Sequence, residues 1–164
     1  MNSRINLNDT DPEAAKAIYN LEKYVERTGI PPLHLHLIKM RASQINGCAY
    51  CINMHTRDAR KLGETEQRIY LLDAWKEVEN LYTNEEKIIL ALTEEITLIS
   101  RHGLSDETYQ KAIKQFGPVK LSQLIMAIIA INSWNRICIS LLIQPEIKLP
   151  GSVKQNVGLV NEFN

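Results

Sequence analysis

The sequence lacks a net charge of either sign, because its 19 basic and 19 acidic side chains cancel. It holds no polybasic arm, so no electrostatic attraction to nucleic acid or to anionic lipid is expected. The longest apolar run, Leu124 to Ile131, is far shorter than the roughly 20 residues that span a bilayer and is interpreted as part of a buried helix. We therefore expect neither a nucleic-acid partner nor a membrane partner.

The N-terminal residues are polar and include no apolar stretch of the signal-peptide type. This predicts a cytoplasmic location, where thiols stay reduced and any disulfide is transient. Cysteine is scarce, with three in 164 residues, and a chain of this length buries an adequate core without disulfides or metals. We expect one domain over residues 1–164.

No segment has the alternating pattern of a strand, because apolar positions recur at spacings of three and four rather than two. This predicts an all-α fold. The first helix is expected to begin at Thr10-Asp11-Pro12-Glu13, which offers a capping side chain and a proline in the first turn, and to end before Gly29. The other helices are expected over about 33–43, 48–62 and 64–74, from the capping box at Thr83, over 105–117 and over 121–142. The polar residues of about 143–164 are expected to form an arm, either loosely packed or crossing to a neighbouring subunit.

Two of the three cysteines stand in the pattern Cys48-x-x-Cys51-x-x-x-His55. On one helix these residues share a face, with neighbouring side chains about 5 to 6 Å apart. Gly47 suggests that the helix begins at Cys48, where free N–H groups and the helix dipole favour a thiolate, and an imidazole one turn on can accept a proton. A thiolate that attacks an oxidant gives a sulfenic acid, and a second cysteine condenses with it to form a disulfide. The pattern therefore predicts a redox dithiol.

Metal binding, haem attachment and plain core packing are the other interpretations of the cluster. Structural zinc usually takes four ligands, and the chain has no second Cys-x-x-Cys, so only Cys138 or another histidine could complete a set. Covalent haem attachment is excluded because Ile52, not histidine, follows Cys51. A plain pair of buried core cysteines stays open, and Cys138 is interpreted as a packing residue of the C-terminal helix. We expect no bound metal and no tightly bound cofactor.

The residues around the cysteines, Lys39-Met-Arg-Ala-Ser-Gln-Ile-Asn-Gly-Cys-Ala-Tyr-Cys-Ile-Asn-Met-His-Thr56, resemble the carboxymuconolactone decarboxylase-like superfamily, specifically its alkylhydroperoxidase D (AhpD-like) branch. The similarity continues through residues 68–75, 91–98 and 130–136, so it covers roughly residues 12–142. The resemblance implies a helical fold that assembles into homotrimers or homohexamers. It also implies a thiol-dependent hydroperoxide reductase activity with an antioxidant role.

The resemblance makes Cys51 the peroxidatic cysteine and Cys48 the resolving one, whereas the helix dipole alone favours Cys48 as the nucleophile. The spacing of Cys51 and His55, one helical turn, agrees with the family assignment. The family has a proton-relay glutamate twelve residues before the first cysteine, where this sequence has His36. A histidine passes protons but supplies no fixed negative charge, so a weakened activity is expected unless Glu94 or Glu95 substitutes.

The leading prediction is an enzyme that reduces a hydroperoxide and is reset by an external dithiol reductant. Alternatives within enzymes are a disulfide oxidoreductase, or a lactone-processing lyase that would remain active with both cysteines replaced. The alternative from another class is a non-enzymatic redox-sensing or ligand-binding oligomer, which the missing glutamate favours.

Overall fold

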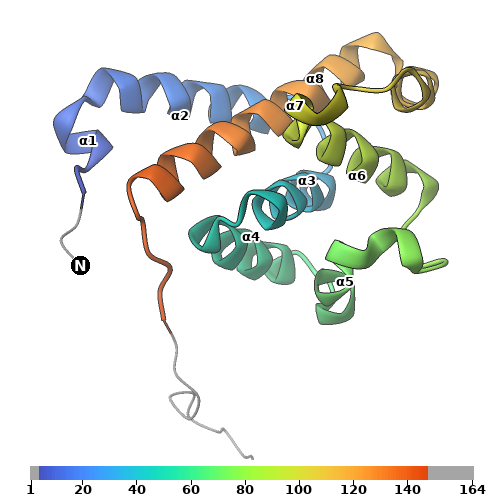
Figure 1. Cartoon of the computed structure of the whole chain (residues 1–164), viewed down its shortest axis with the longest axis horizontal. Coiled ribbons are helices and arrows are strands. Elements are labelled where there is room, and N and C mark those ends of the chain that lie inside the picture. Colours follow the sequence, from blue (N-terminus) through green and yellow to red (C-terminus); the bar gives the residue numbers. More distant parts are fainter. Residues whose placement is uncertain (1–3, 148–164) are drawn as a thin grey trace, which may run out of the picture.

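Helix α8, Asp106–Ser140, is the central element of the protein's computed structural model, which describes residues 4–147. It packs against α2 (Pro12–Glu26), α3 (Pro32–Asn46) and α6 (Asn84–Thr97), and α3 packs in turn on α4 (Ala49–Lys61). Figure 1 shows α8 running across the molecule beside α2, with α3 and α4 below it. Residues 4–147 form one domain without a strand, which confirms the predicted all-α class.

Three of the long helices, α2, α6 and α8, begin at capping signals in the sequence. The Asp11 side chain accepts a hydrogen bond from the backbone N–H of Ala14, and Thr83 forms a reciprocal capping box with Glu86. The Ser105 side chain caps α8 by accepting a hydrogen bond from the backbone N–H of Thr108. Two single-turn helices, α1 (Leu7–Thr10) and α7 (Ile99–His102), were not predicted, because so short a turn leaves no apolar periodicity to detect.

The helix predicted over residues 64–74 is wrong in its extent. The segment forms a short helix, α5 (Glu66–Tyr70), followed by a 3₁₀ helix, η1 (Leu72–Glu77), that kinks at Ala74. The kink allows both Leu72 and Trp75 to be buried in a small apolar cluster against α3 and α6. Tertiary packing therefore overrides the simple helical pattern here.

Gly117 and Pro118 do interrupt the helical pattern, although they do not separate two helices by a loop. Gly117 takes a positive φ of 70°, and the helical path resumes immediately after it. By length and composition α8 could cross a membrane, but the core helix of a soluble protein passes the same test, and α8 packs against α2, α3, α4 and α6. The C-terminal arm predicted from residue 143 lies outside the described residues beyond residue 147.

Candidate active site

The dithiol pattern lies at a tight corner between α3 and α4. Gly47 ends α3 with a φ of 71°, a left-handed conformation that suits glycine, and Cys48 is the N-cap of α4. The predicted helix start at Cys48 is therefore correct. Cys51 lies in the first turn of α4 and His55 one turn later, and both side chains point into the protein and are buried.

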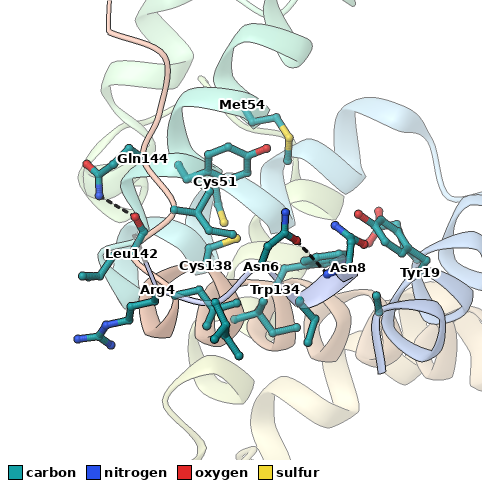
Figure 2. Close-up of a pocket in the computed structure, with 18 of the residues that line it drawn as sticks. Arg4, Asn6, Asn8, Tyr19, Cys51, Met54, Trp134, Cys138, Leu142 and Gln144 are labelled. Carbon is teal, nitrogen blue, oxygen red and sulfur yellow. Dashed lines mark hydrogen bonds between the residues drawn. The ribbon is translucent and has the colours of Figure 1, made fainter. Parts of the chain in front are cut away.

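A third thiol, which the sequence analysis assigned to packing alone, completes the cluster. Cys138 of α8 lies against the first turn of α4, and the sulfur atoms of Cys48, Cys51 and Cys138 all lie within 4.8 Å of one another. Figure 2 shows the sulfur atoms of Cys51 and Cys138 side by side. Three buried thiols could exchange a disulfide among themselves, and they are also ligands that a soft metal ion prefers.

A large, mostly apolar cavity opens beside the cluster. It has a volume of about 710 Å³, and both Cys51 and Cys138 contribute to its wall together with His55. Helices α2, α4 and α8 supply most of the apolar and aromatic lining, which includes Tyr19, Tyr50, Met54, Trp134, Ile137 and Leu141. Part of the wall is the N-terminal segment, where the Arg4 guanidinium donates a hydrogen bond of 2.6 Å to the carbonyl of Ser140. A cavity of this size and polarity suits an apolar small molecule.

The structure brings His36 of α3 next to His55 of α4. The two ring centroids lie 5.7 Å apart, and the Nδ1 atoms of both rings have no hydrogen-bond partner among the described residues. Burial, together with the positive charge of Lys39, lowers the pKa of His55 to about 3 and also lowers the pKa of His36. Both imidazoles are therefore uncharged at neutral pH and free to accept a proton.

Burial also changes the pKa values of the thiols. Desolvation, together with a hydrogen bond to Cys51, raises the pKa of Cys48 to about 11. A hydrogen bond to Cys138, followed by burial, raises the pKa of Cys51, whereas the bond from Cys51 lowers the pKa of Cys138. The expected thiolate at the start of the helix is thus a wrong prediction for Cys48, because loss of hydration outweighs the helix dipole.

The two glutamates predicted as substitute relay groups lie in other networks. The Glu94 carboxylate accepts hydrogen bonds from Arg41, Trp75 and Lys76. The Glu95 carboxylate accepts bonds from Ser105 and Thr108 at the start of α8. Within residues 4–147, neither carboxylate has a recorded contact with His55, and both are engaged in holding helices together.

A carboxylate that the sequence analysis missed lies at the cavity instead. Glu22 of α2 lines the cavity and forms an ion pair with Lys39 of α3, and both groups are mostly shielded from solvent. The negative charge of Glu22 raises the pKa of His36, opposing the effect of Lys39. No local motif marks this pair, because its two residues lie 17 positions apart in sequence on different helices.

Three comparisons with known proteins agree with this architecture. The model of the carboxymuconolactone decarboxylase family matches residues 12–94, which include the dithiol, His36 and His55. An uncharacterized protein of Bacillus subtilis (strain 168), YdfG, is 45% identical over 141 residues, covering 86% of this chain and 95% of the relative.

Two solved structures have a similar fold. A protein of unknown function from Agrobacterium tumefaciens, described as a candidate antioxidant defence protein of the AhpD type, matches with a TM-score of 0.85 and 37% identity, covering 90% of this chain and all of the other. A variant of the debrominase Bmp8 in complex with 2,3,4-tribromopyrrole matches with a TM-score of 0.75 and 19% identity, covering 84% of this chain and 73% of Bmp8. The helical fold, the extent of the family match and the close sequence relatives together establish that the chain belongs to the carboxymuconolactone decarboxylase family.

Proposed function

We propose that the protein is a thiol-dependent hydroperoxide reductase in which Cys51 is the peroxidatic cysteine. The observation that carries the proposal is that Cys51 and His55 line the same apolar cavity, one helical turn apart, with a second thiol within 4.8 Å of Cys51. The nucleophile, a proton acceptor and a resolving group are thus combined at the wall of a space that holds a small substrate.

The Cys51 sulfur attacks one peroxide oxygen while its proton passes to His55. The O–O bond breaks, and the alkoxide takes this proton from His55 and leaves as the alcohol. Cys51 is now a sulfenic acid, and attack by the Cys48 sulfur forms a disulfide and releases water. An external dithiol restores both thiols and becomes a disulfide itself.

The resting site holds neutral groups, so proton transfer must accompany the attack on peroxide. His55 accepts the Cys51 proton during the attack and donates it to the leaving alkoxide, and His36, whose ring is 5.7 Å from that of His55, connects His55 to the Glu22–Lys39 pair. His36 replaces the usual relay glutamate in this route. Because no fixed negative charge adjoins His55, we expect a slower peroxide reaction than a glutamate would give.

The cavity favours an organic hydroperoxide over hydrogen peroxide. Its lining is mostly apolar and aromatic, so transfer of an alkyl or aryl group from water into the cavity is favourable. The group would also contact the ring pair of Tyr19 and Trp134. The same burial weighs against disulfide exchange with folded proteins, because Cys48 and Cys51 are each only 1% exposed. A reductant must therefore be small or must present a flexible thiol.

Self-association into a homotrimer or homohexamer is part of the proposal. Large apolar side chains remain exposed on α8, among them Val119, Ile129 and Ile139, and burying them against another copy of the chain would remove apolar area from water. Light scattering of the purified protein tests this part, and a monomer at micromolar concentration would contradict it.

The test of function is the rate of thiol loss in reduced protein mixed with cumene hydroperoxide or hydrogen peroxide. We expect fast oxidation with cumene hydroperoxide, and loss of this reaction in Cys51→Ser. His55→Gln should be slower by about a hundredfold, whereas His102→Gln, at an exposed position, should match the unaltered protein. A rate no faster than that of a free thiol would contradict the proposal. A lyase would be indicated if lactone turnover persisted with all the cysteines replaced.

A further inference from the structure

Cys138 has a place at the cavity that Cys48 does not share. The wall of the cavity includes Cys51 and Cys138, whereas Cys48 is not among the described residues that line it. Cys138 is also the more exposed of the two partners of Cys51, at 4% against 1% for Cys48. A molecule in the cavity therefore meets Cys51 and Cys138, with Cys48 behind them.

Cys51 and Cys138 also lie close together. Their sulfur atoms are within 4.8 Å of each other on helices α4 and α8, which pack together. A disulfide brings two sulfur atoms to about 2.05 Å and depends on a suitable backbone separation. The two sulfur atoms must therefore approach each other by at most about 2.8 Å to form this bond.

We propose that Cys138 is a second resolving cysteine, so that Cys51 has a partner for disulfide formation on the cavity side as well as in its own helix. The proposal rests on the proposed function, because it starts from the sulfenic acid that a hydroperoxide forms on Cys51. The Cys138 sulfur attacks the Cys51 sulfur, the S–O bond breaks, and the hydroxyl group leaves as water after taking the Cys138 proton. One S–S bond forms, and no further oxidant is needed.

The two disulfides differ in how a reductant reaches them. The Cys51–Cys138 bond faces the cavity, so a small dithiol that enters the cavity can attack it directly. Attack by Cys48 on this bond would transfer the disulfide to Cys48 and Cys51 without any change in oxidation state. Cys138 thus allows oxidised Cys51 to be reduced from the cavity, which is the side from which substrate and reductant arrive.

The test uses three variants of the full chain, Cys48→Ser, Cys138→Ser and the double variant. Each is reduced, freed of metal with a chelator and treated with one equivalent of cumene hydroperoxide, and the products are identified by intact mass and peptide mapping with and without dimedone. We expect Cys48→Ser to lose two hydrogen atoms and give a Cys51–Cys138 peptide. The double variant should instead retain a dimedone-reactive sulfenic acid on Cys51.

A stable sulfenic acid on Cys51 of Cys48→Ser would overturn the role of Cys138 and leave the proposed function intact. Absence of any Cys51 oxidation in all the variants would instead contradict the proposed function. Alanine replaces serine in a parallel set, because a hydroxyl in the apolar cluster could prevent folding, and circular dichroism identifies the variants that retain the helical fold. The set that folds decides the outcome.

Discussion

The imidazole rings of His36 and His55 face each other across the α3–α4 interface with their centroids 5.7 Å apart. In a position where the resemblance implies a glutamate, the chain thus places a second neutral imidazole against the first. Burial and Lys39 lower the pKa of both rings, so proton transfer at this site depends on two weak bases rather than on a base beside a fixed negative charge.

Replacing His36 by glutamate should speed the reaction with hydroperoxide. A carboxylate beside His55 raises the pKa of that imidazole and makes it a better proton acceptor. We expect the rate of Cys51 oxidation at neutral pH to rise by about tenfold in His36→Glu, measured by thiol loss with cumene hydroperoxide. His36→Gln is the matched control, since it has a similar shape without the charge, and an equal gain in both variants would contradict the electrostatic explanation.

Glu22 and Lys39 should shift the pKa of His36 in opposite directions. Lys39 lowers the pKa of His36 and His55, whereas Glu22 raises the pKa of His36. Lys39→Met should therefore raise the imidazole pKa values, and Glu22→Gln should lower that of His36. The measurement is an NMR titration of the imidazole signals, and shifts of the same sign for His36 in both variants would exclude the assignment.

His55 should make the protein less stable in mild acid. Its pKa is about 3 in the folded protein and about 6.5 in an unfolded chain. Between these values the unfolded chain binds the additional proton, so the free energy of unfolding falls as the pH decreases, by up to about 1.4 kcal/mol per pH unit for this group. Above pH ~6.5 the His55 imidazole is neutral in both the folded and the unfolded chain, so it no longer lowers the free energy of unfolding.

Urea unfolding at about pH 7.5, 6.5 and 5.5 checks this dependence, because carboxylates titrate mostly below that range. We expect a smaller decrease in His55→Gln than in the unaltered protein. His36 contributes in the same direction, since its pKa is also lowered. An identical pH profile for His55→Gln would show that folding does not lower the pKa of His55.

A larger residue at Ala15 should change the choice of substrate. Ala15 is buried and lines the cavity, so Ala15→Leu reduces the space beside Cys51. We expect the rate with cumene hydroperoxide to fall by about tenfold, since losing one well-placed apolar contact costs on the order of 1 to 3 kcal/mol, and the rate with hydrogen peroxide to stay nearly unchanged. Lys16→Leu, at an exposed neighbouring position, serves as the control. A parallel loss with both peroxides would indicate damage to the site itself.

The ion pairs of Arg68 should matter for stability more than those at the surface. The Arg68 guanidinium binds the carboxylates of Glu64 and Glu86, which are 4% and 9% exposed. Arg68→Met leaves these two carboxylates without their partner, so we expect a loss of about 3 to 5 kcal/mol in the free energy of unfolding. Lys61→Met, which breaks the exposed pair with Asp58, should cost less than about 1 kcal/mol. Urea unfolding of the two variants compares them directly.

The sequence determined those features that depend on neighbours along the chain. Capping side chains at Asp11, Thr83 and Ser105 marked where helices begin, and the spacing of Cys51 and His55 placed a thiol and an imidazole one turn apart on α4, with Cys48 at its N-cap. Helical geometry fixes such relationships within a few residues, so they could be predicted without the fold.

The tertiary structure alone decided which distant groups meet at the site. Cys138 joins the dithiol and Glu22 pairs with Lys39 because α8 packs against α2, α3 and α4, while Glu94 and Glu95 hold other helices. Only the packed structure also fixes how deeply a group is buried, and burial reversed the expected acidity of Cys48. Contacts between helices and loss of water depend on the whole fold, so no short pattern of residues encodes them.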